Sequence, residues 1–352
     1  MGLRPVYGHA ALLDRLGATL ASGRFPQATL FVGPAGVGKQ RLALWVAQGL
    51  LCENGPGTPC GNCQGCRQVL SLSHPDLHWF VPLSGLKATE PDKQVEEVQE
   101  LLGEVMAARR ENPLWEEPDG MARHPLASVR LLQRLIALRP FQGDRRAIIL
   151  GRAERLVVQE ASQEAANALL KVLEEPPPGT YLILTAREPH ALLPTIRSRL
   201  VPLRVLGVGD AAVRRFLERE LDPPLAKEEL ERRVLLAEGS IGRAIWAGGI
   251  SGSPAQAAAE FLAAVKGGPE RWAAAALGQP PWAARGQFSE MLDALLLRLR
   301  EGLVQRAGRD PESLPRLLEA IRLVEQIRAD AQGNVNPQLG FAVLASGLSA
   351  LR

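Results

Sequence analysis

A glycine-rich segment, Gly33-Pro34-Ala35-Gly36-Val37-Gly38-Lys39-Gln40, lies between a short apolar run at 28–32 and a stretch at 41–47 with helical spacing. A strand, a glycine-rich turn and a helix in this order are the context of a phosphate-binding P-loop. Glycines let successive backbone N–H groups turn inward around an anion, and the helix N-terminus and Lys39 add positive charge. The segment therefore predicts a nucleotide site, or the remnant of one. Its candidate residues are Gly33, Pro34, Gly36, Val37, Gly38, Lys39 and Gln40.

Two positions lack the groups that ATP hydrolysis requires. A P-loop ordinarily ends in Ser or Thr, whose hydroxyl binds Mg²⁺, whereas Gln40 offers an amide on a longer side chain. A buried parallel strand predicted at 146–150 should end in an acidic pair, but Gly151-Arg152 follows it. Glu154 comes two positions later, and we expect it to be a solvated carboxylate. The sequence therefore favours a phosphate cradle without hydrolysis; the alternative is an ATPase that uses Lys39 with an unusual carboxylate such as Glu154.

All four cysteines lie between positions 52 and 66, with the spacing C-x7-C-x2-C-x2-C. Two overlapping Cys-x-x-Cys turns that contain glycines let thiolates converge on one tetrahedral ion. A redox pair needs only two cysteines, and an iron–sulfur run would place its fourth cysteine downstream and before a proline. We therefore predict a structural Zn²⁺ without an open catalytic position, and do not expect His74 or His78 to bind it. The predicted ligands are Cys52, Cys60, Cys63 and Cys66.

Composition describes an ordinary globular chain. Its 352 residues are 46% hydrophobic and 22% charged, which suits two or three domains. The net charge is +3 and aromatic residues make up 5%, so a free-standing DNA-binding protein with a zinc module is disfavoured. No run of about 18 apolar residues is long enough to span a membrane, and the N-terminus lacks the apolar core of a signal peptide. We expect a cytoplasmic protein.

Strands that alternate with helices predict an α/β domain with a mainly parallel sheet up to about Val205. Strands are expected at 28–32, 146–150 and 181–185, with a short one inside 73–82. A charged stretch at 84–124 contains one amphipathic helix, and packing on its own domain is favoured over binding a partner. Beyond Val205 the pattern is helical, and its leucine-rich final part is typical of an oligomerising bundle. Helices are expected at 210–221, 227–237, 240–246, 288–296, 314–331 and 339–351, with a glycine-rich linker at 248–254.

Two arginines, Arg197 and Arg199, lie in a short polar helix or turn at 194–199, after the strand at 181–185. Ligand loops of α/β sheets gather at the carboxyl ends of the strands. These arginines are either ordinary surface charges or groups that reach a phosphate bound by a neighbouring subunit, as arginine fingers do.

Taken together, these motifs resemble the clamp-loader branch of the AAA+ ATPases over nearly the whole chain. The resemblance rests on the P-loop, the cysteine module, the helix at 163–178 that runs into prolines, and the segments 195–199, 239–244 and 334–337. It implies three domains. These are an AAA+ nucleotide-binding-type α/β domain at 1–206, with the zinc module at 52–66 and the insertion at about 84–124, an all-α lid at 207–248 and an all-α collar at 254–352.

Within that branch the chain is most similar to the non-hydrolysing stator subunit, because it has His74-Pro75-Asp76 and lacks the acidic pair. The resemblance implies a hetero-pentamer with gamma/tau and delta subunits, which loads a sliding clamp on primed DNA. It also implies that Arg199 is a finger directed at the ATP of an adjacent gamma/tau subunit, with Arg197 as its neighbour, and that Arg243 is the sensor arginine of the lid. Leu200 departs from the family, which has cysteine there. A gamma/tau-like ATPase subunit is the alternative.

Overall fold

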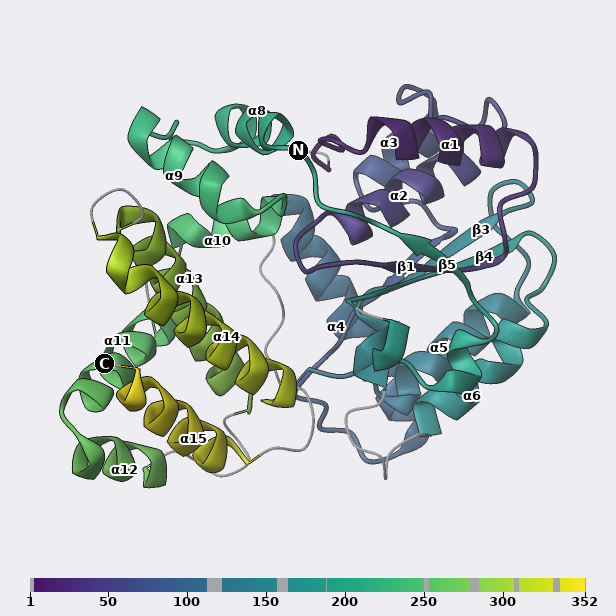
Figure 1. The fold of residues 1–352 in the computed structure, drawn as a ribbon. Coiled ribbons are helices and arrows are strands. Elements are labelled where there is room, and N and C mark those ends of the chain that lie inside the picture. The colour runs from purple at the N-terminus through teal and green to yellow at the C-terminus, as the bar shows by residue number, and fades with distance from the viewer. Residues whose placement is uncertain are drawn as a thin grey trace. The chain divides into compact units, whose positions relative to one another are not determined.

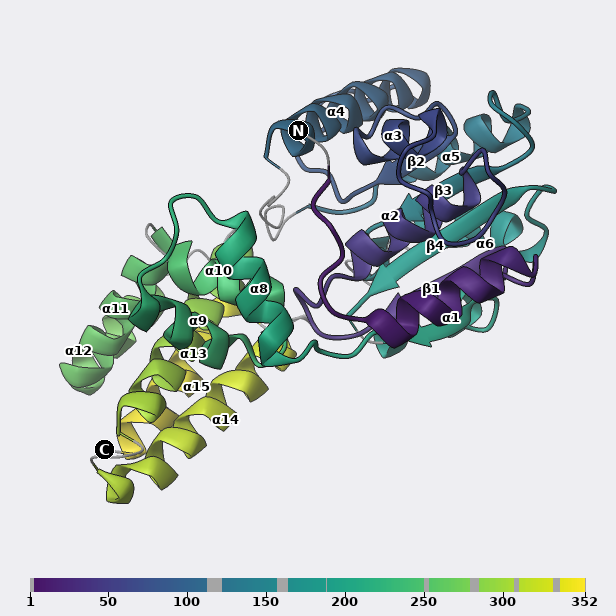
Figure 2. The same cartoon turned by 90° about the horizontal axis from the view of Figure 1, so that it is seen from above.

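The computed structural model describes residues 3–112, 122–156, 164–187, 189–249, 253–278, 285–306, 310–331 and 336–351. The chain forms two compact units, one that ends at Gly242 and one that begins at Arg243. Figures 1 and 2 show the two units from directions 90° apart. The division into three domains stays a prediction.

The first unit is built on a five-stranded sheet in the order β2-β3-β4-β1-β5, with every neighbouring pair parallel (Figure 1). The strands are β1 (Ala28–Val32), β2 (Leu77–Phe80), β3 (Arg146–Leu150), β4 (Thr180–Ala186) and β5 (Val201–Arg204). Strands β1 and β3 are buried along their whole length, as expected for a sheet that helices cover on both faces. The predicted α/β fold with a parallel sheet is confirmed.

Helices cover both faces of this sheet. In Figure 1, α1, α2 and α3 lie above the sheet, and α5 and α6 lie below it. The helices of this part are α1 (Ala10–Ala21), α2 (Lys39–Leu50), α3 (Gln64–Leu70), α4 (Pro91–Glu111), α5 (Leu126–Ala137), α6 (Glu164–Glu174) and α7 (Pro194–Arg197). The core between the layers includes Leu30, Phe31, Leu42, Ile149 and Leu169, which are fully buried. Apolar side chains at helical spacing on α2 and α6 meet the continuous apolar runs of β1 and β3 there.

Helix α4 is the amphipathic helix predicted within 84–124. Val95, Val98 and Leu102 on one side of α4 are buried in the core of the first unit. The prediction that this helix packs on its own domain is therefore confirmed. Residues 113–121 of the stretch lie outside the described residues.

Beyond β5 the described residues are helical, as predicted. The helices are α8 (Asp210–Glu220), α9 (Lys227–Ala237), α10 (Ile241–Gly249), α11 (Ser253–Lys266), α12 (Pro269–Leu277), α13 (Arg285–Arg306), α14 (Leu314–Ala331) and α15 (Pro337–Ala350). The second unit has its own core, in which the rings of Phe261 and Phe341 meet edge to face at 4.6 Å. The predicted linker at 248–254 is too long at both ends, because α10 continues through Gly249 and α11 begins at Ser253. Glycine is well tolerated at the end of a helix.

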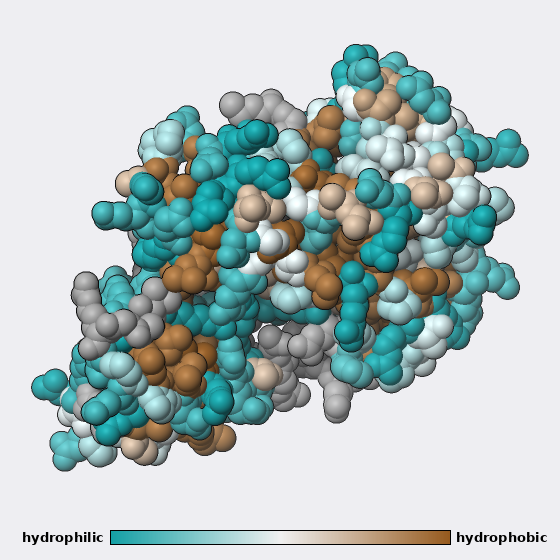
Figure 3. All heavy atoms as spheres, turned by 45° about the horizontal axis from the view of Figure 1, so that its top comes forward, coloured by the Kyte–Doolittle hydropathy of each residue, from teal (hydrophilic) through white to brown (hydrophobic). Residues whose placement is uncertain are grey.

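The described helices differ from membrane spans. None of them combines the length and the apolar character that crossing a bilayer requires. On the face drawn in Figure 3, hydrophobic side chains gather in separate patches between hydrophilic ones.

Candidate nucleotide site and metal centre

The glycine-rich segment joins β1 to α2, so the predicted strand and helix on its two sides are confirmed. Gly36 and Gly38 have φ values of 73° and 94°, a region that strains any residue with a Cβ. A Cβ on Gly33 would lie 2.0 Å from the carbonyl oxygen of Val205. These three glycines are therefore required by the path of the backbone.

Lys39 and His9 bind the carbonyl groups of the segment. The ammonium of Lys39 donates to the carbonyl oxygens of Gly33 and Pro34, both at 2.7 Å. His9, which caps α1, donates from Nε2 to the carbonyl oxygen of Val37 at 2.9 Å. A phosphate would have to compete with these carbonyls for Lys39.

The start of α10 packs directly on the same segment. The hydroxyl of Ser240 donates to Ala35 O at 2.9 Å, and the amide of Gly242 donates to Gly36 O at 2.9 Å. A Cβ on Gly242 would lie 2.6 Å from the Cα of Gly36, so the two backbones are in close contact. Arg243 follows directly in α10. Its predicted role as a sensor stays a prediction.

Gln40 lies against Gly151. A Cβ on Gly151 would be 3.1 Å from Oε1 and 3.2 Å from Nε2 of the Gln40 amide. The last P-loop residue and the residue after the strand are the positions from which an ATPase provides its Mg²⁺ ligands. Among the described residues, Oε1 of Gln40 is buried and accepts no hydrogen bond. The amide thus occupies the space where those ligands would meet.

The residues after β3 form an ion pair and a buried hydrogen bond. Arg152 has a φ of 55° and is followed by the short helix η1 (Ala153–Leu156). This turn places Glu154 Oε1 3.9 Å from Arg152 Nε, with only 14% of the Glu154 side chain exposed. The prediction that Glu154 is solvated is therefore wrong. Beside this pair, His124 Nε2 donates to Gly151 O at 2.8 Å, and burial lowers the pKa of His124 to about 4.

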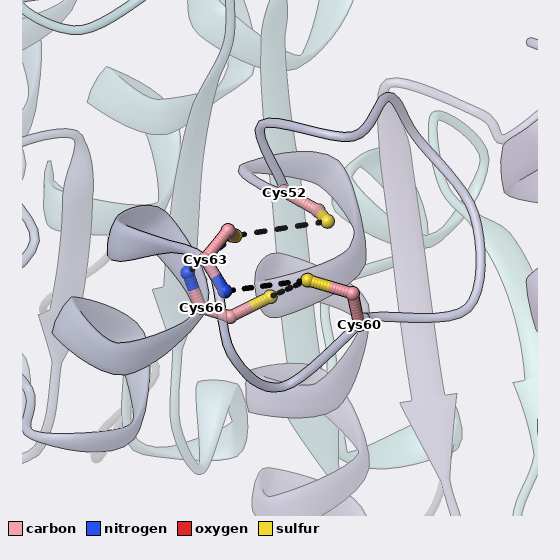
Figure 4. Close-up of side chains that lie close together, drawn as sticks. All are labelled: Cys52, Cys60, Cys63 and Cys66. Atoms are coloured by element: carbon pink, nitrogen blue, oxygen red, sulfur yellow. Dashed lines mark hydrogen bonds between the residues drawn. The ribbon is translucent and has the colours of Figure 1, made fainter.

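The four cysteines lie together, as Figure 4 shows. The Sγ atoms of Cys52 and Cys63 are 3.9 Å apart, and those of Cys60 and Cys66 are 3.8 Å apart. All four sulfurs lie within 4.8 Å of one another. A tetrahedral ion with Zn–S bonds of about 2.3 Å requires sulfur separations of about 3.8 Å. The cluster therefore has the size of a four-thiolate metal site.

The local backbone supports thiolates in this cluster. Cys52 follows α2, and Cys63 is the N-cap of α3. The amide of Cys63 donates to Cys60 Sγ at 3.4 Å, and the amide of Cys66 donates to Cys63 Sγ at 3.3 Å. Hydrogen bonds from Cys63 and from Asn62 lower the pKa of the Cys60 thiol to about 6, whereas burial raises the pKa of Cys66. A bound cation would stabilise the thiolate at every one of the four positions.

Arg199 is held from within its own chain. Its Nε donates to Oε1 of Glu174 at 2.9 Å, and its Nη1 donates to Thr195 O at 2.7 Å. Glu174 is the last residue of α6, and 32% of the Arg199 side chain remains exposed. Arg197 has a different partner, since its Nη1 lies 3.0 Å from Nδ1 of His190. The two arginines are therefore separately oriented, and Arg199 is held by hydrogen bonds to residues of two helices, α6 and α7.

His9 and Ser240 also belong to the candidate nucleotide site, although the sequence shows no sign of their contacts with the P-loop; Ser240 stands out there only as part of the segment 239–244. They bind residues that are 28 and 205 positions away along the chain. Neither residue belongs to a local spacing that predicts such a contact. Only the folded chain reveals them.

Comparison with known proteins gives a consistent set of relatives. A family model described as "DNA polymerase III, delta subunit" matches residues 8–207, more than half of the chain. The chain is 34% identical over 232 residues to a Pseudomonas aeruginosa protein named DNA polymerase III subunit delta', covering 65% of this chain and 57% of that protein. It is 27% identical over 210 residues to the Bacillus subtilis protein named DNA polymerase III subunit delta', covering 59% of this chain and 51% of that protein. The chain spans about half the length of these curated relatives.

More distant similarities extend to another subunit. The chain is 29% identical over 238 residues to the Escherichia coli DNA polymerase III subunit tau, covering 67% of this chain and 30% of that protein. A solved structure of a gamma-subunit-related protein of DNA polymerase III from Thermotoga maritima is 14% identical, with a TM-score of 0.38 over 97% of this chain and 99% of that one. This TM-score is too low to define the fold of the whole chain.

Proposed function

The chain belongs to the family described as DNA polymerase III, delta subunit, and from this premise we propose that it is the delta'-type, non-hydrolysing stator subunit of a clamp loader. In this role it assembles with gamma/tau and delta subunits into a hetero-pentamer, and the complex loads a sliding clamp on primed DNA. The chain reaches the clamp and the DNA through that complex. The names of the delta' and tau relatives support this assignment.

The contact of Gln40 with Gly151 carries the proposal that the chain does not hydrolyse ATP. Hydrolysis requires Mg²⁺ ligands and a carboxylate that positions water, but Gln40 stands where the P-loop hydroxyl would be and Gly151-Arg152 stands where the acidic pair would be. Glu154, the nearest replacement, is already paired with Arg152. Removal of such groups typically slows catalysis by orders of magnitude. A gamma/tau-like ATPase is therefore the weaker alternative.

We assign the P-loop an architectural role. Its carbonyl groups bind His9 at the start of α1 and Ser240 and Gly242 at the start of α10. The segment thus joins parts of the chain that are far apart in sequence. Such a network suits a subunit that stays rigid while its neighbours change shape.

Arg199 would act on the nucleotide of an adjacent subunit. Its guanidinium is partly exposed and is oriented by Glu174 and by the carbonyl of Thr195. A positioned arginine can stabilise the charge that develops on a phosphoryl group in transit. The chain would then contribute to catalysis at a site that it does not itself form.

The cysteine cluster would hold one structural zinc. Cys52 follows α2 and Cys60 lies in the loop between the helices, whereas Cys63 and Cys66 belong to the start of α3. The ion therefore fixes α3 to the end of α2, in a segment too short to have a core of its own. Four thiolates leave no position for a substrate.

The C-terminal helices would provide the collar. In the second unit, Leu277, Leu339 and Val343 are 77%, 61% and 46% exposed. Leu339 and Val343 lie four residues apart on α15, and Gln338 of that helix donates to Leu277 O at 3.2 Å. Apolar side chains that share a face without covering favour association between subunits.

Reconstitution from purified subunits tests the proposal. The chain, gamma/tau and delta should form a five-subunit complex that loads the clamp, and Leu339→Ser with Val343→Ser should weaken its assembly. Leu235→Ser is the matched control, because Leu235 is 57% exposed on α9, outside the collar. An active loader that forms equally well without this chain would refute the proposed function.

A further inference from the structure

The loop between α5 and β3 exposes two large apolar side chains. Leu138 is 66% exposed and Phe141 is 83% exposed. No large apolar side chain among the described residues is more exposed than Phe141. Exposed aromatic rings are unusual on a monomer surface and are typical anchors of protein interfaces.

A buried carboxylate holds the backbone of this loop. Asp76, which is 1% exposed, accepts hydrogen bonds from the amides of Phe141 at 2.7 Å and Gln142 at 2.6 Å. Asp76 directly precedes β2 and belongs to the His74-Pro75-Asp76 motif, in which His74 Nδ1 accepts from the Asp76 amide at 3.1 Å. The buried carboxylate of Asp76 therefore fixes the backbone conformation that exposes Phe141.

Arg146 completes the scaffold from the other side. This first residue of β3 is 4% exposed, and its guanidinium lies 3.8 Å from Asp76. Its Nη1 donates to the carbonyl of Leu138 at 3.1 Å and also to that of Leu135. One buried ion pair thus fixes the backbone under both exposed side chains. A fixed loop loses little conformational entropy when a partner binds.

The loop lies at the edge of the sheet opposite the candidate nucleotide site. It enters the amino end of β3, and the neighbouring turn at Gly179 enters the amino end of β4. The P-loop follows the carboxyl end of β1, and all the strands are parallel. Leu138 and Phe141 therefore belong neither to that site nor to its cradle.

The charges around the pair favour a protein with acidic side chains. Arg139 lies between the two apolar residues, is exposed, and has no ion pair within the described ranges. Arg145 forms an ion pair with Asp144 at 3.6 Å, so these two neighbouring charges add no net charge to the loop. One free arginine beside an aliphatic and an aromatic side chain is too little charge to follow a nucleic-acid backbone, which is bound by clusters of basic residues.

We propose that Leu138 and Phe141 form a docking surface for a folded protein with an apolar pocket bordered by carboxylates. Phe141 and Leu138 enter the pocket, and Arg139 pairs with its rim. The His74-Pro75-Asp76 motif then has a role, which is to present this surface.

Binding measurements with the full-length chain test the proposal. The choice of probes rests on the proposed function: gamma/tau, delta and the sliding clamp are each titrated separately against the immobilised chain. Phe141→Ser should lower the affinity for one of them by about thirtyfold, the loss typical of an interface anchor. Arg139→Glu should weaken the same complex. Leu206→Ser is the matched control, because Leu206 is 69% exposed and follows β5.

The outcomes distinguish a failure of the docking surface alone from a failure of the proposed function. Unchanged binding of the Phe141→Ser protein to every probe would overturn the docking surface and leave the proposed function intact. Single-stranded DNA is titrated in the same way, and loss of its binding by the Phe141→Ser protein, with all protein complexes intact, would mean that Phe141 stacks on bases and would also overturn the docking surface. A wild-type chain that binds none of the probes would overturn the proposed function, and the docking surface with it.

Discussion

The amide of Gln40 fills the space into which a side chain at Gly151 would project, since a Cβ at Gly151 would lie 3.1 Å from its Oε1. The long side chain of Gln40 fits there because Gly151 has no side chain. Both positions would provide Mg²⁺ ligands in an ATPase. The packing of Gln40 against Gly151 therefore links the two positions, and each residue depends on the other.

This dependence predicts a coupling between the two positions. Gly151→Ala should lower the free energy of unfolding by about 1 kcal/mol, because the added Cβ crowds the amide. In a Gln40→Ala background the same change should cost less than half as much, which a double-mutant cycle in urea measures. Gly103→Ala is the control, since nothing lies within 4 Å of its added Cβ in α4. Equal costs in both backgrounds would contradict the packing argument.

The cysteine cluster predicts about one zinc per chain by elemental analysis. Cys63→Ser should lose the metal and lower the melting temperature by several degrees, because α3 is no longer fixed to α2. Asn62→Ser, one position away, should keep both. A Cys63→Ser protein with its metal and melting temperature unchanged would argue against a structural site.

Two histidines, the buried His124 and the half-buried His78, predict a loss of stability in mild acid. Burial lowers the pKa of His124 and of His78 to about 4, below the value of about 6.5 in an unfolded chain. Between about pH 6.5 and pH 4 these histidines are protonated in the unfolded state but remain neutral in the folded state. The free energy of unfolding therefore decreases as the pH falls through this range. For His124 the loss should be about 2 kcal/mol between pH 7.5 and pH 5.

Urea unfolding at both pH values measures this loss. The control is His124→Gln, which keeps a donor toward Gly151 but does not titrate. It should lose less stability in acid than the wild type does. An identical pH dependence for the two proteins would show that His124 does not contribute.

The fixed orientation of Arg199 predicts a defect in a neighbouring subunit. In the reconstituted loader with DNA, Arg199→Ala should slow hydrolysis at one ATP site by about a thousandfold, the usual value of an arginine finger. A single-turnover assay would show this as a fraction of bound ATP that persists. Arg197→Ala, whose partner is His190, is the matched control. Normal single-turnover kinetics of an assembled Arg199→Ala loader would disprove the role.

The sequence was most informative where the structure is local or fully buried. The apolar runs at 28–32 and 146–150 coincide with β1 and β3, because strands that are covered on both faces carry continuous apolar residues. The cysteines could be grouped because the ligands are close in sequence. By contrast, β5 is an edge strand with Val201 half exposed and a proline next to it, so no apolar pattern predicts it.

Contacts between residues that are far apart in the sequence could not be predicted from the sequence. The bonds of His9 and Ser240 to the P-loop and of Asp76 to Phe141 join residues of common types over long separations. Similarly, the positive φ of Arg152 turns Glu154 back toward it, where the sequence predicts a solvated carboxylate. Such pairings are set by the course of the backbone and leave no periodic pattern.

The central claim is that this chain retains a phosphate cradle but does not hydrolyse ATP. The most direct measurement is the steady-state ATPase activity of the purified chain alone with Mg²⁺, beside its Lys39→Ala variant. We predict no turnover above background for either protein. Turnover by the wild-type chain that Lys39→Ala abolishes would contradict the account.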